Sequence, residues 1–482
     1  MVLLLPVLLP LAGGIFVFRQ TMEERRNRLA LAVVLVTAAL ALLVCVLPEQ
    51  RLELLVIQGS QHLALRNDGL AKFFLALMAG IWVPVLVFSF PYIKHEGREA
   101  QFLGFYTMTL GALMGLAMSD SFVTLYMFFE IMSLITVPLV LHTPSRISRR
   151  AGFKYLGYSV FGAGMALAGY FFVSAHLTSP SFVAGGSLAS SAQSHQTLLL
   201  VVYCLMIVGF GAKAGLMPMQ AWLPAAHPVA PAPASAVLSG LITKGGVLAV
   251  IRVTYYMYSP GFLQGTWPQY VLLTLALCTI FVGSMLAYRE KLLKRRLAYS
   301  TVSQVSYVLF GLLLLTPAGV QAALCQAVFH AVAKDTLFLA AGAIIFATEY
   351  TRVDQLRGIG QRMPVTLWCF TLAGLSLVGI PPLAGAISKW YLLSAGLAAQ
   401  VGGFGVAGMI VLIVSALLTA GYLLSIVVMG FFPGRDFPVQ ARQEVGPLMY
   451  WPLILLAVLC VLLGLLPAGL IDWLGKLAGT LF

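Results

Sequence analysis

The sequence predicts an all-α, polytopic membrane protein of about 14 transmembrane helices, arranged as two inverted five-helix repeats with helices 7 and 12 broken. Apolar residues make up 60% of the 482 residues and charged residues only 9%, which is typical of membrane proteins. Apolar runs of about 20 residues, each long enough to cross a hydrocarbon core of roughly 30 Å, recur along the whole chain. Prolines interrupt two of these runs beside lysines, and such interruptions are tolerated in a membrane where they line a cavity.

The expected spans follow one another with short connections. The longest connection, residues 176–198, is rich in Ser, Gly and Ala, and we expect no separate soluble domain. The spans are expected at about residues 2–18, 29–47, 70–90, 102–118, 121–141, 153–175, 199–223, 235–257, 267–287, 297–315, 321–347, 366–396, 403–431 and 447–470.

The charges of the connections predict the topology. The first span is apolar from its first residue and Arg19 follows it, which is the reverse of a secretory signal, so we expect this helix to be retained. With the N-terminus outside, the odd-numbered connections are cytoplasmic and hold most of the 29 Lys and Arg, whereas the outside connections 177–198 and 258–266 hold none. We therefore expect a multi-pass protein of a prokaryotic inner (plasma) membrane with both termini on the outer side. The net charge of +13 follows from this topology and does not indicate nucleic-acid binding.

No cofactor motif occurs in the sequence. The six cysteines lie singly in apolar segments without CxxC spacing, which argues against an iron–sulfur or zinc site and favours small packing residues. There is neither a glycine-rich phosphate loop nor a dinucleotide fingerprint. We expect no cofactor, no metal and no catalytic centre on this chain.

Five charged side chains remain inside the apolar runs, namely Glu130, Lys213, Lys244, Lys334 and Lys389. Each costs roughly 2.5–3.5 kcal/mol to place at mid-bilayer, so the set opposes folding unless its members are paired or hydrated. An ion pair joining two helices would explain one glutamate and one lysine. It does not explain the set, because Glu130 and Asp335 do not neutralise four lysines.

An excess of buried lysines favours proton exchange. Desolvation and mutual repulsion lower the pKa of a buried lysine, in documented cases from about 10.4 to about 5–6, so that it loads and unloads a proton near neutral pH. A proton conductor needs such groups and needs neither a metal nor a covalent step. We expect Glu130 to hold Lys213 protonated when the two are close, and to release the proton when they separate.

His330 and Lys334 are spaced four residues apart, which places them on one helix face. A single histidine in an apolar helix is more often a core residue bonded to a backbone carbonyl. The lysine on the same face instead favours proton transfer along the pair. For Asp335 two interpretations remain open: it tunes Lys334, or it forms a salt bridge elsewhere.

Two proline clusters predict the broken helices. In Leu216–Pro233, LMPMQAWLPAAHPVAPAP, Pro218 follows Lys213 and should break helix 7, whereas 224–233 reads as an uncharged cytoplasmic turn with His227 facing the proton inlet. Pro381 and Pro382 precede Lys389 in helix 12 in a similar way. Helices 7 and 12 point in opposite directions under the predicted topology, as expected of inverted repeats.

The repeats suggest four segments along the chain. We expect an N-terminal three-helix segment at 1–100, a first five-helix repeat at 101–257, a second at 258–431 and a C-terminal helix 14 at 432–482. Glu130, Lys213 and Lys244 fall in the first repeat, and the other buried lysines and His330 in the second.

Several motifs together resemble one family. They are RNDGLAKFF at 66–74, FFEIMSL at 128–134, KAGLMPMQAWLPAAHPVAPAPASAVLSGLITKGG at 213–246, LKRRLAYSTVSQVSY at 293–307, HAVAKDTLFLAAGAI at 330–344 and RMPVTLWCFTLAGLSLVGIPPLAGAISKW at 362–390. In this order and spacing, the chain resembles the antiporter-like membrane subunits shared by respiratory complex I, Mrp-type cation/proton antiporters and related membrane-bound hydrogenases.

The resemblance implies a 14-helix subunit with two inverted half-channels joined by a polar axis at mid-membrane. By motif match, Glu130 is the glutamate of helix 5, and the lysines fall on helices 7, 8, 11 and 12 at Lys213, Lys244, Lys334 and Lys389. It further implies that His227 and His330 serve proton connection or gating. The implied partners are the bilayer, other membrane subunits including homologous antiporter-like ones, and redox subunits in some assemblies.

Three features depart from the family pattern. Many members have LPDAH where this chain has LPAAH, so Ala225 leaves His227 without a neighbouring carboxylate. Asp335 stands where a small residue is common. The chain ends soon after its last expected span, without room for the long lateral helix of the most distal complex I subunit, and Lys244 in LITKGG also resembles the subunits without that extension.

The function expected from the sequence is proton translocation, with Na⁺/H⁺ exchange as an open variant, in a multi-subunit assembly. A stand-alone ion-coupled secondary transporter is the alternative, and it should show a solute pocket at the helix breaks. A haem- or quinone-binding subunit is less consistent with the residues, since only His330 and His227 qualify as intramembrane haem ligands. A structural spacer would not need four buried lysines. One chain does not separate a redox-driven complex from an Mrp-type antiporter.

Overall fold

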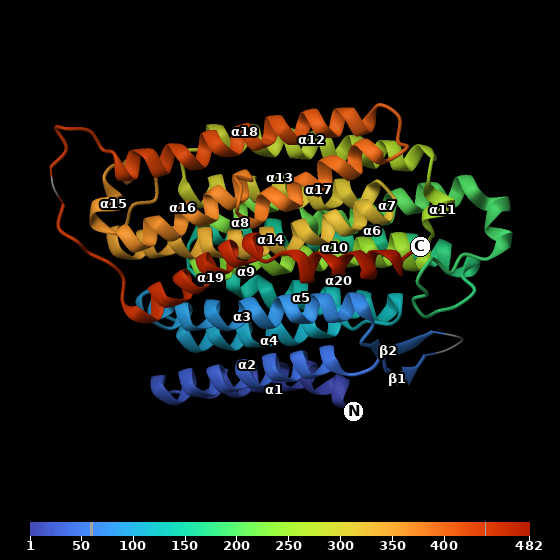
Figure 1. The fold of residues 1–482 in the computed structure, drawn as a ribbon. Helices are drawn as coiled ribbons and strands as arrows, with labels where there is room; N and C mark the ends of the chain where they lie inside the picture. Colours follow the sequence, from blue (N-terminus) through green and yellow to red (C-terminus); the bar gives the residue numbers. More distant parts are fainter. Residues whose placement is uncertain (58–60, 439) are drawn as a thin grey trace.

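The computed structural model describes residues 1–57, 61–438 and 440–482. Most of the helices lie nearly parallel, from α1 and α2 at one edge of the bundle to α12 and α18 at the other (Figure 1). The helices are α1 (Leu5–Arg19), α2 (Glu23–Val46), α3 (Gly69–Glu96), α4 (Glu99–Ala117), α5 (Phe122–Val140), α6 (Arg146–Val173), α7 (Gln196–Ala214), α8 (Leu223–Val229), α9 (Ala232–Val237), α10 (Thr243–Ile251), α11 (Pro260–Leu263), α12 (Trp267–Arg289), α13 (Leu293–Leu313), α14 (Pro317–Thr348), α15 (Ile359–Arg362), α16 (Pro364–Val378), α17 (Ala384–Ala398), α18 (Phe404–Phe431), α19 (Pro447–Leu465) and α20 (Ala468–Gly479).

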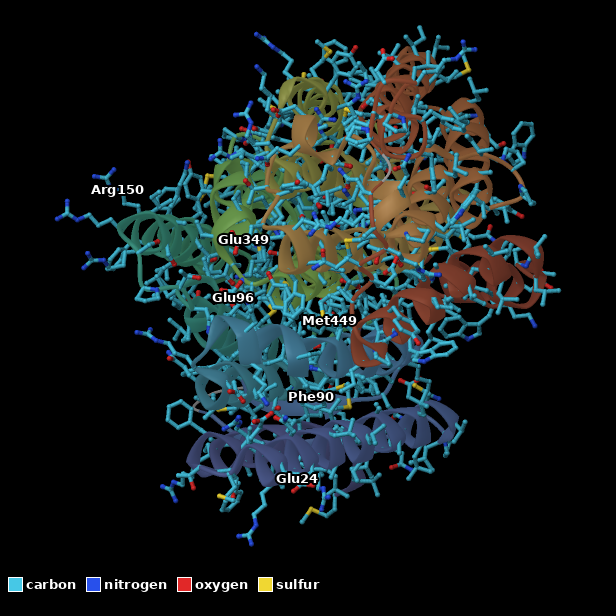
Figure 2. The ribbon with its side chains drawn as sticks, turned by 90° about the vertical axis from the view of Figure 1, so that its left-hand side faces the viewer. Glu24, Phe90, Glu96, Arg150, Glu349 and Met449 are labelled. Atoms are coloured by element: carbon cyan, nitrogen blue, oxygen red, sulfur yellow. The ribbon has the colours of Figure 1, made fainter. Side chains whose placement is uncertain are left out.

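The prediction of a polytopic helical membrane protein is confirmed. Within the described residues, 12 helices are long and apolar enough to cross a membrane. Both termini lie at the same end of the bundle (Figure 1). Figure 2 looks onto the opposite end, where Glu24, Glu96, Arg150 and Glu349 lie.

A short hairpin departs from the expected all-α fold. Strand β1 (Arg51–Val56) pairs antiparallel with β2 (His62–Arg66) in a connection that the sequence analysis left without structure. Arg51 and Arg66 each form an ion pair with Asp120, which precedes α5. The hairpin is therefore held by contacts with a distant segment, which its own residue pattern does not reveal.

Both expected helix interruptions are present. Helix α7 ends at Ala214, Gly215 takes a left-handed conformation (φ 82°), and the chain becomes helical again in α8. The indole of Trp222 donates to Ala212 O (2.7 Å), a carbonyl in the last turn of α7 that also accepts the N–H of Gly215. The second interruption separates α16 from α17 and begins at Gly379, also left-handed (φ 94°). Each interruption contains a cis X–Pro bond, at Pro218 and Pro382.

The most enclosed segment of the bundle is Ala232–Met257, in which every residue is buried. It begins with α9, widens into a π-helical turn at Leu238–Ile242, continues as α10 and ends in a second π-helical turn at Arg252–Met257. Such turns add a residue to the helical turn and often occur at functional sites. The segment packs against α14, so these two elements form the centre of the molecule.

The last expected span, residues 447–470, forms two helices, and the second helix extends beyond the expected end. Helix α19 ends at Leu465, Pro467 follows, and α20 continues toward the end of the bundle that holds the termini (Figure 1). Proline lacks the N–H that a continuous helix needs. Gln321 of α14 donates to Ile471 O (3.0 Å) and thereby fastens α20 to the bundle.

Candidate functional site

The ammonium of Lys213 lies in the last turn of α7, surrounded by hydroxyl groups. It donates to Ser133 Oγ (2.9 Å), Tyr155 OH (2.6 Å) and Ser159 Oγ (3.1 Å). The Tyr155 ring also faces it, with 4.3 Å from Nζ to the ring centroid. A cation in this position is further stabilised by the partial negative charge at a helix C-terminus.

Glu130 lies apart from Lys213 in this structure. Its Oε1 has no hydrogen-bonding partner, and within the described part of the chain no ion pair joins the two side chains. The carboxylate and the ammonium are nevertheless close enough to interact electrostatically. The structure therefore shows the separated arrangement of the expected pair, with hydroxyls in place of the carboxylate.

Lys244 and His330 are in direct contact. Lys244 Nζ lies 2.5 Å from His330 Nδ1 and also donates to Ser239 O (2.8 Å). Because α10 carries Lys244 and α14 carries His330, this contact joins residues that the sequence analysis placed in different repeats. The contact lets one proton pass between them: an ammonium can donate to the imidazole, and an imidazolium can donate to the amine.

Lys334 lies one turn beyond His330 on α14 and is completely buried. Its ammonium donates to Leu297 O of α13 (2.9 Å). The His330 ring lies within electrostatic range of Lys244, Lys334 and Lys389, so the three lysines surround it. Within the described part of the chain its Nε2 has no hydrogen-bonding partner, which leaves that nitrogen available for a second proton transfer.

Lys389 reaches back across the second helix interruption. It extends from α17 and donates to Leu377 O, one of the last carbonyls of α16. The arrangement resembles that of Lys213, because each ammonium lies at the C-terminal end of the first half of a broken helix, where a cation is favoured.

A hydrogen-bonded bridge of Gln304, Gln326 and Ser388 lies beside His330 and Lys389. Gln326 donates from Nε2 to Gln304 Oε1 (3.0 Å), and Ser388 Oγ donates to Gln326 Oε1 (2.6 Å). The two glutamines line one internal cleft together with His330 and Lys389. The sequence analysis missed this bridge, although Gln326, His330 and Lys334 recur at intervals of four residues on one helix face, a pattern that could have revealed it.

His227 is fully buried on α8 and stacked on Phe338 at 4.8 Å, and neither ring nitrogen has a hydrogen-bonding partner among the residues that the structure describes. It lies within electrostatic range of Lys294 and Lys334. With Ala225 in place of an aspartate, α8 offers its ring no acidic partner. His227 therefore stands between the central lysines and the end of the bundle opposite the termini.

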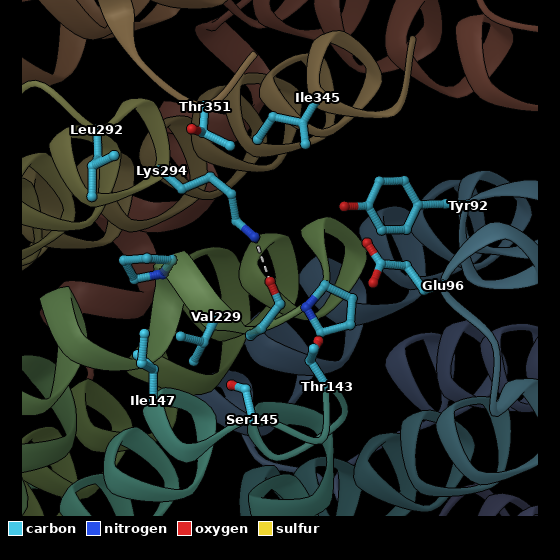
Figure 3. A pocket seen from close by; sticks show the side chains of 13 residues that line it. Tyr92, Glu96, Thr143, Ser145, Ile147, Val229, Leu292, Lys294, Ile345 and Thr351 are labelled. Atoms are coloured by element: carbon cyan, nitrogen blue, oxygen red, sulfur yellow. Dashed lines mark hydrogen bonds between the residues drawn. The ribbon is translucent and has the colours of Figure 1, made fainter. Parts of the chain in front are cut away.

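A cavity of about 370 Å³ opens beside the proline-rich turn that follows His227. Figure 3 shows Lys294, Tyr92 and Glu96 pointing toward one another around it, with the Lys294 ammonium bonded to Ala230 O. The sequence analysis assigned Lys294 to a basic connection and left Glu96 out. Nothing in their local pattern distinguishes them from other charges at helix ends, so only the folded chain identifies the cavity.

The helices that carry Lys213 and Lys244 approach each other closely. A Cβ added at Gly246 of α10 would lie 2.7 Å from Ala214 N and 2.9 Å from Phe210 O, both in α7. The structure thus places Lys213, Lys244, His330, Lys334 and Lys389 on neighbouring helices of one buried core, with Glu130 and His227 flanking it. Imidazole and amine groups gain and lose protons, and hydroxyl and amide groups donate and accept hydrogen bonds between them, so this set is suited to proton transfer.

Comparisons with known proteins match most of this chain to one family. Residues 117–419 match the family model described as NADH:quinone oxidoreductase/Mrp antiporter, TM. NADH-quinone oxidoreductase subunit N of Desulforudis audaxviator is 30% identical over 419 residues, covering 84% of this chain and 82% of that protein. Hydrogenase-4 component B of Escherichia coli is 31% identical over 425 residues, which cover 84% of this chain and 62% of that protein.

A solved structure shares the fold. One chain of the Mrp complex from Dietzia sp. superposes with a TM-score of 0.87 at 21% identity, covering 99% of this chain and 97% of that chain. The resemblance noted in the sequence is confirmed by these matches.

Proposed function

This chain belongs to the NADH:quinone oxidoreductase/Mrp antiporter transmembrane family, and from that membership we propose that it is the proton-translocating subunit of a multi-subunit membrane complex. The similar proteins named above are parts of a quinone oxidoreductase, a hydrogenase and an Mrp assembly. The energy for translocation would come from partner subunits or an existing ion gradient, and Na⁺/H⁺ exchange is the variant that an Mrp-type assembly would require.

The proposed path begins at the cavity beside the proline-rich turn. A proton taken up near Glu96 and Lys294 reaches His227 and then Lys334, whose electrostatic coupling to His227 places the two within one buried region. Lys213, with Glu130 behind it, and Lys244 form the first half of the axis. His330 passes the proton through the cleft of Gln304 and Gln326 to Lys389 for release on the other side.

The contact between Lys244 and His330 is the observation that carries this proposal. Lys244 Nζ lies 2.5 Å from His330 Nδ1, so one proton can pass directly between the two side chains. One of the two helices belongs to the first expected repeat and the other to the second. A stand-alone solute carrier would need a polar pocket at the helix interruptions. What lies at the second interruption is a narrow cleft whose lining includes His330 and Lys389.

The finer topology forms part of the proposal. Adding α13 and the α16–α17 pair to the 12 apolar helices gives 14 spans, if α7–α8 and α19–α20 each count once. The segments around the two interruptions, each with a lysine at a half-helix end, would then be equivalent parts of two inverted repeats. The lysine- and arginine-rich connections would face the cytoplasm.

The first prediction tests the relay itself. Lys213→Met and Glu130→Gln should each lower proton translocation on the order of 100-fold, because a positioned proton donor or acceptor is typically worth that much. Everted membrane vesicles that contain the complete complex report translocation as quenching of a pH-sensitive dye. Co-purification of the partner subunits should remain unchanged in both variants.

Lys154→Met is the matched control, because Lys154 is an exposed lysine on α6 outside the buried core. It should translocate protons at the rate of the unmodified protein. Normal transport in the Lys213→Met and Glu130→Gln variants would contradict the proposed function.

A further inference from the structure

Asp335 is a buried acidic residue that the proposed path does not use. It follows Lys334 on α14 but points about 100° away from it around the helix axis. Its side chain is fully buried, and neither carboxyl oxygen has a hydrogen-bonding partner among the described residues. A buried carboxyl without a partner opposes folding, so its presence calls for a partner in another state of the protein.

The backbone opposite Asp335 is shaped to receive its carboxyl group. Gly240, in the π-helical turn Leu238–Ile242, lies against it so closely that an added Cβ would fall on the carboxyl oxygens. Four residues later, Lys244 contacts His330. The segment therefore runs antiparallel to α14, with Gly240 opposite Asp335 and Lys244 opposite His330.

Lys244 is the cation suited to Asp335. Its ammonium uses two hydrogens, toward Ser239 O and His330 Nδ1, and the carboxyl of Asp335 lies within electrostatic range of it. Lys334 donates instead to Leu297 O on α13.

The other polar groups near Asp335 are already engaged or weakly polar. Tyr106 of α4 donates its hydroxyl proton to Trp82 O (3.1 Å), Thr336 donates to Val332 O (2.8 Å), and Cys460 of α19 offers only a thiol. Among these groups Lys244 is the one that could pair with a carboxylate by a side-chain rotation.

We propose that Asp335 is the second partner of Lys244, and that movement of the ammonium between His330 and Asp335 closes and opens the connection between the two halves of the proton path. With Lys244 on His330, a proton passes between them. With Lys244 on the Asp335 carboxylate, Nδ1 of His330 loses its contact with Lys244. The His330 ring then transfers a proton only toward Lys389. Protonation of Asp335 removes the attraction and returns Lys244 to His330. This role rests on the proposed function and makes Asp335 a positioning residue.

A relocated carboxylate tests the proposal. Asp335→Ala should lower proton translocation by everted vesicles of the complete complex at least about tenfold, because Lys244 then has only one acidic or basic partner. The double variant Gly240→Asp with Asp335→Ala places a carboxylate on the opposite wall of the same space, four residues before Lys244. It should recover a substantial part of the lost rate.

The size-matched control is Gly240→Ala with Asp335→Ala, which fills the space without a charge and should stay inactive. Asp335→Asn gives a second reading, since it keeps the shape and should be as inactive as Asp335→Ala. In infrared difference spectra of the purified complex, taken on a change of pH, a carboxyl band should disappear in Asp335→Asn and persist in Glu130→Gln.

Native transport in Asp335→Asn would overturn the proposal, and so would equal rates in the two double variants. The proton translocation rate of Lys213→Met shows whether such a result refutes only the role of Asp335 or the proposed function as well. If Lys213→Met is inactive while Asp335→Asn is active, the relay stands and only the role of Asp335 is refuted.

Discussion

Neutral groups hold the four lysines that lie inside the apolar runs. Lys213 donates to hydroxyls, Lys244 to an imidazole and a carbonyl, and Lys334 and Lys389 to backbone carbonyls. A carboxylate in direct contact would hold the ammonium in its protonated form, because a nearby opposite charge favours the charged form of a titratable group. Neutral partners satisfy the ammonium while leaving its proton transferable.

Arg252 and Asp68 show the contrasting arrangement. Two hydrogen bonds of 2.5 and 3.0 Å join the guanidinium to the carboxylate, and the Tyr256 ring lies 4.4 Å from the guanidinium carbon. Arginine does not lose its proton in proteins, so this pair fixes structure and does not conduct. It ties the start of α3, which Asp68 caps through Ala71 N, to the end of the central segment.

The pair predicts how stability depends on pH. Asp68 lies immediately before the span Gly69–Glu96. Burial raises the pKa of its carboxyl group, but the charge and the hydrogen bonds of Arg252 have a larger effect in the opposite direction. The pKa of Asp68 is therefore lower than the ordinary value of 3.8. This contribution to stability is therefore complete above about pH 3.8 and is lost as the pH falls through the lower, folded-state pKa. Asp68→Asn should destabilise the detergent-solubilised protein by about 3–5 kcal/mol at pH 7, because it leaves a buried charge unpaired.

Thermal unfolding at a series of pH values checks this prediction. The gap in Tm between the unmodified protein and Asp68→Asn should narrow as the pH falls below the ordinary carboxyl range. Asp354→Asn is the control, since Asp354 pairs with Arg352 at an exposed site and should change Tm little. A gap that is constant at every pH would contradict the assigned role.

At the scale of elements, interrupted helices and close helix contacts position the lysines. Each interruption ends a half-helix at mid-bundle, where free carbonyls and the helix dipole favour a cation. Gly246 lets α10 approach α7 so closely that the backbones touch, and Gly385 of α17 plays the same part against Ser376 of α16. The glycines thus set the spacing between helices whose side chains exchange protons.

Replacement of Gly246 by alanine tests this spacing. The added Cβ meets backbone atoms that do not rotate away, so the variant should lose about 1–3 kcal/mol of stability and also translocate protons more slowly. Gly164→Ala on α6 is the matched control, because no atom lies within 4 Å of its added Cβ. It should gain up to about 1 kcal/mol from the higher helix propensity of alanine. Equal Tm shifts in the two variants would refute the explanation.

At the scale of the whole molecule, the buried charged groups lie within a largely apolar interior, and the outer faces of several helices are apolar as well. Exposed apolar residues such as Phe16, Phe161 and Leu417 lie on α1, α6 and α18, where lipid or a neighbouring subunit would cover them. The central segment Ala232–Met257, by contrast, is wholly buried and carries Lys244. The molecule thus has its proton-exchanging groups where the bilayer does not reach them.

Labelling of single cysteines tests the proposed orientation. In a cysteine-free background, Ser191→Cys in the loop before α7 should react with a membrane-impermeant maleimide on intact cells, because this loop lies at the end of the bundle that holds the termini. Arg150→Cys, at the opposite end, should react only after permeabilisation. The reverse pattern would invert the topology and with it the direction of the proposed path.

Much of the fold was predictable from local pattern. Helical spans, their approximate ends and both interruptions follow from apolar run length and proline position, since each reflects the chain's own contact with the bilayer. The hairpin β1–β2, the π-helical turns and the division between α19 and α20 did not follow. They depend on ion pairs and helix contacts between residues distant in the sequence.

Span length and the cost of a buried charge are local properties, so the amino-acid pattern alone predicts that this chain crosses a membrane many times and which charged residues remain in its apolar runs. The partner of each charge follows instead from the fold. Lys213 meets Ser133 from 80 residues away and Lys244 meets His330 from 86 residues away, so their contacts depend on how whole helices pack. The same packing turned Asp335 toward Gly240, which no spacing along the chain revealed.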